Sequence, residues 1–439
     1  MKPRTILIVG WVVFLLYAYP GYLGPGAADQ LIDARTGQFT DWNPVMMTEV
    51  WRLGWRFIDG PSVMLFLQSS LLLAGAYQLL RQLLVERTSA YLAVAILWFP
   101  AVIASTAVIA PEPMAASLLV AGTAALCATA RAWKVVGLAL FVAAGGMTTA
   151  ALVAALPIVL AFLGLGVLRA VAAWATVVIV SLGLAYVLVD DRTERPALER
   201  AMHDIAGTLH FAPPLPSDQI ATLLDGCPLA APPSELQQRA NRAYPKPGRY
   251  IAGASRLFEH VDAEHVNTVI AARDRLVRAQ PRAYLRHRLH VWTSELGFTK
   301  HWHPLIESFV PARVDGAQLS YLSSHSLTQR VLLAPVRWLS RTALFRPHLY
   351  LAIAVILGIW AVVRRHRDAA VLLASGLAYE LALMFTAGAT PQWFDSEWLV
   401  VACLLGAVMV FFGELEPRHE RIGEQAALGA ADHDRVSHG

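Results

Sequence analysis

Residues 135–168 read VVGLALFVAAGGMTTAALVAALPIVLAFLGLGVL and contain no ionisable side chain. A helix needs about 20 apolar residues to cross a hydrocarbon layer of about 30 Å, so this run is too long for one crossing. Gly145, Gly146 and Pro157 interrupt it, and both residue types weaken a helix interior. We therefore predict two short membrane helices that meet near Gly146–Thr149. This division fixes the orientation of every segment downstream.

The rest of the chain has the same apolar character. Hydrophobic residues make up 56% of it and charged residues 15%, and the mean hydropathy is +0.48. A soluble domain is about a quarter charged, so the composition excludes a soluble globular enzyme, a disordered chain and a nucleic-acid-binding domain. The other predicted spans are Thr5–Leu23, Ser62–Leu84, Ser89–Ala110, Met114–Ala130, Ala170–Val189, Leu349–Val363, Ala369–Gly388 and Trp398–Phe412. The fold class is an all-α integral membrane protein with about ten transmembrane helices.

Basic residues support this division of the chain, because short cytoplasmic loops are enriched in arginine and lysine. With ten spans, the basic residues near span ends all lie on the cytoplasmic side, whereas merging the split run would place Arg364–Arg367 outside. The residues concerned are Lys2, Arg4, Arg81, Arg87, Arg131, Lys134, Arg169, Arg364, Arg365, Arg367, Arg418 and Arg421. We expect a multi-pass protein of the bacterial inner membrane with both termini in the cytoplasm. A cleaved leader over residues 1–28 is the competing interpretation of the first run.

The predicted spans divide the chain into domains. Residues 1–189 form an N-terminal bundle of about seven spans, with a first outside loop at 24–61, and residues 348–412 form about three more. Between them lies a periplasmic domain, residues 190–347, mixed but mostly helical; its prolines between 213 and 247 predict loop in its first half. Residues 413–439 are predicted to be a disordered cytoplasmic tail.

A helix is predicted in the second half of the periplasmic domain. Leu285, Leu289, Trp292 and Leu296 are spaced to share one helix face. Such a helix suits the membrane interface or the mouth of the bundle, and an ordinary helix of the soluble domain fits equally well.

Acidic residues gather at the predicted outer rim. Almost no acid lies deep in a span apart from Glu380, which argues against an ion-coupled transporter. The rim acids are Asp29, Asp33, Asp41, Glu49, Glu112, Asp395 and Glu397. A carboxylate beside a lipid-facing aromatic groove can serve as a general base toward a sugar hydroxyl, and solvated loop charge is the alternative. Three isolated cysteines and the pair His301 and His303 specify no metal site.

Several motifs resemble the polytopic glycosyltransferases of superfamily C, in particular bacterial relatives of the protein O-mannosyltransferases and lipid A sugar transferases. The resemblance covers most of the chain, and its order and topology are more specific than any single motif. The motifs are Tyr19-Pro20-Gly21-Tyr22, Asp29-Gln30-Leu31, Asp41-Trp42-Asn43-Pro44, Gln280-Pro281-Arg282-Ala283-Tyr284-Leu285-Arg286-His287-Arg288 and the turn Thr390–Val400.

This resemblance implies a membrane enzyme that moves a sugar from a polyprenyl-phosphate-linked donor to a periplasm-facing lipid or glycan acceptor, as in lipopolysaccharide and other cell-envelope synthesis. Asp29 is the expected catalytic base and Glu112 the supporting acid. The expected substrate-binding residues are Asp33, Asp41, Trp42, Arg286, Arg288 and Gln392. Some relatives need a divalent metal, but no metal ligand is assigned here, and the expected partners are the donor, the acceptor and membrane lipids.

The chain also departs from the pattern of these relatives. Gly26 stands where their first-loop aspartate is expected, Asn43 replaces a histidine, and Gln392-Trp393-Phe394 replaces an Arg-Tyr pair. An arginine expected near Thr148–Thr149 is absent. The alternatives are therefore a catalytically altered or inactive relative, a surface polysaccharide polymerase or ligase, and, from another class, a transporter or flippase of a lipid-linked substrate.

Overall fold

A computed structural model describes most of the chain. The described residues are 1–24, 26–40, 43–58, 60–190, 195–244, 257–259, 261, 265–298, 312–315, 318–321, 326–386 and 392–412. For residues 195–196, 243, 312–315 and 318–321 only the backbone is described. The predicted cytoplasmic tail, the histidine pair 301 and 303, and two predicted substrate-binding residues, Asp41 and Trp42, lie outside the described residues.

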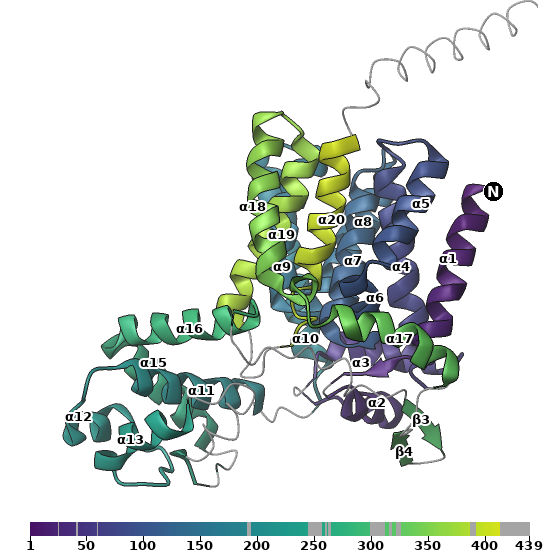
Figure 1. The fold of residues 1–439 in the computed structure, drawn as a ribbon. Coiled ribbons are helices and arrows are strands. Elements are labelled where there is room, and N and C mark those ends of the chain that lie inside the picture. The colour runs from purple at the N-terminus through teal and green to yellow at the C-terminus, as the bar shows by residue number, and fades with distance from the viewer. Residues whose placement is uncertain are drawn as a thin grey trace, which may run out of the picture.

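Apolar helices form a bundle in the upper part of Figure 1, most of them with roughly parallel axes. They are α1 (Pro3–Ala18), α4 (Ser62–Leu80), α5 (Glu86–Leu97), α6 (Pro100–Thr106), α7 (Pro111–Leu126), α8 (Arg131–Met147), α9 (Thr149–Phe162), α10 (Val167–Leu188), α18 (Pro347–Val363), α19 (Arg367–Thr386) and α20 (Glu397–Phe412). Each apolar segment predicted from the sequence coincides with one of these helices or with the pair α5–α6. The chain is thus an α-helical membrane protein.

The lengths of the helices indicate which of them can cross a membrane alone. Among the described residues α4, α10 and α19 are long and apolar enough to cross a membrane, and α5 with α6 qualifies as a pair bent by 71°. Other apolar helices, including α1, α9, α18 and α20, are shorter than 18 residues. The number of crossings and their sidedness therefore stay predictions.

The long apolar run breaks where its glycines and threonines stand. Helix α8 ends at Met147, Thr148 has an extended backbone, and α9 begins at Thr149. A Cβ on Gly145 would collide with the side chain of Leu152 in α9, so glycine lets the two helices approach each other. Pro157 lies inside α9, as the sequence indicates.

The bend between α5 and α6 is followed by a short connection that is fixed inside the bundle. Strand β2 (Val108–Ile109) pairs in parallel with β1 (Tyr22–Leu23), which leaves α1. The buried Gln68 side chain of α4 donates from Nε2 to the carbonyl oxygens of Thr106 at 2.6 Å and Val108 at 3.0 Å. This link holds the last residues of α6 and the start of α7 at the lower end of the bundle, next to the outer segments (Figure 1).

The outer segments are mostly helical. They comprise α2 (Ala27–Thr36), α3 (Val45–Trp55), α11 (Arg195–Phe211), α12 (Ser217–Leu223), α13 (Pro233–Ala243), α15 (Val266–Ala279), α16 (Pro281–Glu295), α17 (Leu327–Leu339), the 3-10 turn η4 (Ala343–Phe345), and the antiparallel strands β3 (Ala312–Asp315) and β4 (Gln318–Tyr321). The prediction of loop for the first half of the periplasmic domain is wrong, because α11, α12 and α13 occupy it. Two of its prolines stand at helix starts, where a missing N–H does no harm: Pro216 caps α12 and Pro233 opens α13.

Two hydrophobic cores organise the molecule. The larger runs through the bundle and takes in Val291 of α16 and Leu333 of α17, whereas a separate one joins α11, α12, α13 and α15. The predicted helix through Leu285 and Trp292 is confirmed as α16, which extends from the outer helices to the lower end of α19 (Figure 1). The polar residues of α16 therefore lie between the outer helices and the mouth of the bundle.

Candidate active site

Five carboxyl groups from separate parts of the chain meet where α16 reaches the bundle. Glu112 stands in the first turn of α7, Glu295 ends α16, Glu380 lies in α19, Asp395 lies in the turn before α20, and Glu397 begins α20. We call this set the carboxyl cluster. Glu112 interacts electrostatically with Glu295, Asp395 and Glu397, and Glu295 and Asp395 also interact with each other and with Glu380.

The carboxyl cluster is buried. Glu380, Glu295 and Glu397 are 0%, 1% and 2% exposed, whereas Glu112 and Asp395 are half-buried. Glu112 and Asp395 are thus the more exposed members of the carboxyl cluster. Burial of a carboxylate without a cation is costly, so this arrangement is not explained by folding alone.

Hydrogen bonds satisfy only part of the carboxyl cluster. The Thr106 hydroxyl donates to Oε1 of Glu397 at 2.9 Å, and the backbone N–H of Gln392 donates to Oδ2 of Asp395 at 2.9 Å. The carboxyl oxygens of Glu295 and Glu380 have no hydrogen bond of good geometry to any described residue, although Glu295 lies in looser contact with Asp395 and Glu380 with Ser396. An unsatisfied buried polar group costs about 1–3 kcal/mol, and such groups mark sites kept for function.

Burial changes the acidity of the two cluster members outside the membrane helices. It raises the pKa of Glu295 well above its usual range, and the neighbouring Asp395 raises it further. Burial likewise raises the pKa of Asp395, with Glu112 as the next cause. A carboxyl whose pKa is raised holds its proton to a higher pH than usual, which suits it to general acid or base chemistry.

Polar and aromatic side chains complete the surroundings of Glu397. Ser105, Tyr350 and Trp393 line a small pocket together with Glu397. The indole of Trp393 is buried and packs against Phe345 with ring centroids 5.5 Å apart. The pocket encloses about 10 Å³, which is the space of about one water molecule.

Among the described residues, Asp29 and Asp33 of the first outside loop have no contact with the carboxyl cluster. Asp29 is exposed in the first turn of α2, while Gln30 points inward and donates to the carbonyl oxygen of Pro44 at 3.1 Å. Asp33 is half-buried, Thr40 donates to it at 3.3 Å, and its pKa is raised, chiefly by burial. None of the contacts found among the described residues joins Asp29 to Glu112. The expectation that Asp29 is the base stays a prediction, and the carboxyl cluster offers further candidates for that role.

The predicted phosphate contacts on α16 differ from each other. Arg286 is exposed. Arg288 is fully buried: its Nε donates to the carbonyl oxygen of Met384 in α19 at 2.8 Å, and its Nη1 contacts Oδ1 of Asp204 at 3.3 Å. We therefore revise the role of Arg288 from lipid phosphate binding to fastening α16 onto α11 and α19. Gln392 lies in the turn before α20, where its backbone holds Asp395.

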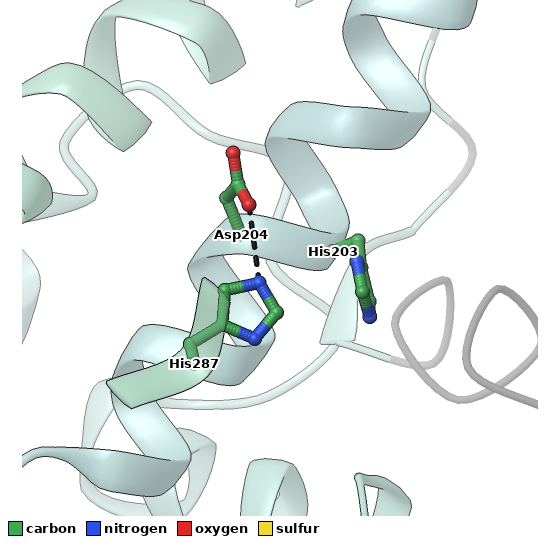
Figure 2. A group of neighbouring side chains, drawn as sticks. All are labelled: His203, Asp204 and His287. Carbon is green, nitrogen blue, oxygen red and sulfur yellow. Dashed lines mark hydrogen bonds and ion pairs between the residues drawn. The ribbon is translucent and has the colours of Figure 1, made fainter. Parts of the chain in front are cut away.

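The buried group around Arg288 also contains His203, Asp204 and His287 (Figure 2). His287 Nε2 lies 3.1 Å from Asp204, and its Nδ1 lies 2.6 Å from the Tyr244 hydroxyl. These distances fit a hydroxyl that donates to Nδ1 while Nε2–H donates to the carboxylate. Burial would raise the pKa of Asp204, but the hydrogen bond from His287 and the charge of Arg288 outweigh it and lower the pKa.

This group has the composition of a metal site but is arranged as a hydrogen-bonded network. Among the described residues, only His203, Asp204 and His287 bring three possible ligand atoms within 4.8 Å of one another. However, both ring nitrogens of His287 have partners, and Arg288 already balances the charge of Asp204. A divalent cation here would lie beside a buried guanidinium, so the residues do not fit a metal. We assign the group a structural role.

Sequence reasoning singled out Glu112, Glu380, Asp395 and Glu397 but missed Glu295. The available signal for Glu295 was that the helix predicted to pack on the mouth of the bundle ends in an acidic residue. Sequence reasoning also missed Arg346, whose Nη1 lies 3.5 Å from the carbonyl oxygen of Gly297, two residues after Glu295.

Comparisons with known proteins yield little. No protein-family profile matches the chain, and neither does any curated protein. The chain is similar to a solved structure, that of ArnT from Cupriavidus metallidurans bound to undecaprenyl phosphate, with 15% sequence identity and a TM-score of 0.38. The similarity covers 93% of this chain and 77% of that one. At this level the likeness carries no argument about the site, which rests on its own geometry.

Proposed function

We propose that this chain is a membrane glycosyltransferase that moves a sugar from a polyprenyl-phosphate-linked donor to a hydroxyl of a lipid or glycan acceptor. The observation that supports this most is the carboxyl cluster, which lies mostly buried at the mouth of an apolar bundle with only part of its hydrogen bonds made. A lipid-borne donor can reach such a place from the membrane, while a hydroxyl acceptor arrives from the outer side. A carboxyl group there can take a proton from that hydroxyl.

Glu112 is the proposed base. It is half-buried, and it interacts electrostatically with Glu295, Asp395 and Glu397. The acceptor hydroxyl gives its proton to Glu112, and its oxygen forms a bond to the anomeric carbon. The bond between that carbon and the phosphate oxygen breaks, polyprenyl phosphate leaves with the electron pair, and the configuration inverts.

Arg346 is the proposed phosphate contact in place of Arg288. It is half-buried between η4 and α18 and contacts Gly297, close in sequence to Glu295. A guanidinium binds phosphate with two parallel hydrogen bonds, which lysine cannot reproduce. The phosphate of the donor is anionic, and a guanidinium at the same junction can balance its charge. Arg286, exposed on α16, stays a second predicted contact.

Mass spectrometry of envelope glycolipids tests the proposed function. A deletion strain should lack a product heavier by one sugar residue, and the wild-type gene should restore it. Glu112→Gln should reduce transfer by about 100-fold or more, because it removes the base without changing the size of the side chain. Glu49→Gln is the matched control, since Glu49 is a rim acid paired with Arg52 outside the carboxyl cluster.

Two outcomes would contradict the proposal. Full restoration of the product by Glu112→Gln would remove Glu112 from the mechanism. A deletion strain with unchanged glycolipids, together with vesicles that flip a lipid-linked sugar without forming a glycosidic bond, would favour the transporter alternative.

A further inference from the structure

A groove lies at the opposite end of the bundle from the carboxyl cluster. It has a volume of about 450 Å³ between α9, α18 and α19, near the end of the molecule that carries the N-terminus (Figure 1). Its lining residues are Pro157, Ala361, Val362, Arg365, Arg367, Ala370, Val371 and Ala374. The walls are thus apolar, and the two arginines are the ionisable groups among the lining residues.

The sequence explains why these three helices leave a hollow. Pro157 lies inside α9 and donates no backbone hydrogen bond, which distorts a helix at that point. The other two helices contribute small side chains to the lining, namely those of Ala361, Ala370 and Ala374. Their single methyl groups cannot fill the space that larger residues would occupy. The groove is therefore built from named residues of three helices.

Arg365 stands in a conformation that suits glycine. After α18 ends, the N–H of His366 donates to the carbonyl oxygen of Ala361 at 2.8 Å, and that of Arg365 donates to Val362 at 3.1 Å. This is the Schellman arrangement, in which the residue at the position of Arg365 takes a left-handed backbone. Arg365 has a φ of 61°, a conformation that disfavours side chains with a Cβ. An arginine kept where glycine is more stable indicates a use for its side chain.

Arg367 is held at the same edge of the groove. Its Nη2 donates to the carbonyl oxygen of Ala161 near the end of α9, at 3.1 Å. Arg364 and Arg365 are exposed beside it, while the half-buried Asp368 follows in the first turn of α19. The mouth of the groove therefore has an excess of positive charge above apolar walls.

We propose that this groove binds an anionic phospholipid. One acyl chain lies along the apolar walls formed by Pro157, Ala370 and Ala374. The phosphate lies at the mouth, where Arg365 and Arg367 donate hydrogen bonds to it. Apolar walls with basic residues at the membrane surface match the two chemistries of such a lipid. The site is distant from the carboxyl cluster and does not depend on the proposed function.

Native mass spectrometry of the full chain in detergent tests the lipid site. The probes are dioleoylphosphatidylglycerol, which is anionic, and dioleoylphosphatidylcholine, which has no net charge. Each arginine near the membrane surface strengthens anionic lipid binding by about fivefold, so the wild type should prefer the anionic lipid by at least that factor. Arg365→Gly should lose most of this preference. Its unfolding midpoint without lipid should be unchanged or higher, because glycine suits the left-handed position.

Further variants separate the parts of the site. Arg365→Asn, which also tolerates the left-handed backbone, should behave like Arg365→Gly, and Ala374→Phe should weaken binding of both lipids by filling the groove. Arg131→Gln is the matched control, an exposed arginine at the start of α8 that does not line the groove. The proposal is overturned if Arg365→Gly and Arg365→Asn keep the anionic preference, or if the control loses it equally. Displacement of the lipid by inorganic phosphate at equal concentration would also overturn it, because the site would then recognise a free anion.

Discussion

Helix α16 contains two buried polar groups that differ in how they are satisfied. His287 and Arg288 form hydrogen bonds with Asp204, Tyr244 and the backbone of α19. Glu295, about two turns further along, is equally buried and has no hydrogen bond of good geometry to a described residue. One helix thus carries a satisfied network and an unsatisfied carboxyl.

We use this difference to distinguish residues that stabilise the fold from residues that act on a substrate. A satisfied buried network holds elements together and gains nothing from a ligand, whereas an unsatisfied acid weakens the fold unless something else uses it. We therefore assign the Asp204 network to anchoring the outer domain and the carboxyl cluster to catalysis. The predictions below test this division, beginning with the largest effect.

Removal of the Asp204 carboxylate should destabilise the protein most. Asp204→Ala leaves the buried Arg288 without its counter-charge and His287 without its acceptor, which costs about 3–5 kcal/mol. The midpoint of thermal unfolding should fall, and amides of α16 should exchange faster. Asp218→Ala, at an exposed position in α12, is the control and should leave the midpoint unchanged. An unaltered midpoint in Asp204→Ala would show that the network does not anchor the domain.

Replacement of Glu295 by an apolar residue should have the opposite effect on stability. Glu295→Met keeps the length of the side chain but removes a buried, unsatisfied carboxyl, so the free energy of unfolding should increase by about 1–3 kcal/mol. Sugar transfer should decrease in the same variant, because the carboxyl cluster loses a member. Glu235→Met, at an exposed ion pair with Arg239, is the control. A destabilised Glu295→Met would mean that Glu295 has a stabilising partner.

The two groups should also respond oppositely to pH. The pKa of Glu295 is raised, so its contribution to stability is complete below the ordinary carboxyl range and is lost as pH rises through the higher value. The pKa of His203 is lowered to about 3, mainly by burial, so its contribution is complete above about 6.5 and is lost as pH falls. The unfolding midpoint of Glu295→Met should exceed that of wild type by a margin that widens from pH 5 to pH 8. A margin that narrows over this range would contradict the assigned pKa direction.

Local sequence patterns predict the membrane helices well. A run of apolar residues specifies a buried or lipid-facing helix by itself, and the break at Thr148 follows from Gly145, Gly146 and the two threonines. Prolines were misread in the outer domain, because Pro216 and Pro233 start helices that the chain pattern did not reveal. Proline marks a helix start as readily as a loop, and sequence alone does not distinguish the two.

The candidate site was predictable only in part, because its residues meet through packing. Glu112 and Glu397 lie in separate membrane helices, and Glu295 reaches them only because α16 packs on the lower end of α19. No spacing pattern in the sequence predicts that these three residues lie close together. The contrast between Arg286 and Arg288, one exposed and one buried two positions away, is likewise invisible without the partner Asp204.

The smallest effect should come from the residue that the sequence favoured as the base. Asp29→Asn changes an exposed side chain in α2 that has no described contact with Glu112, so sugar transfer should change by less than about twofold. Glu112→Gln, measured in the same assay, should lose about 100-fold or more. If Asp29→Asn instead abolishes transfer while its unfolding midpoint stays at the wild-type value, the first loop must bring Asp29 to the donor during the reaction. The carboxyl cluster would then support the acceptor or the leaving group, and Asp29 would be the base that the family resemblance implies.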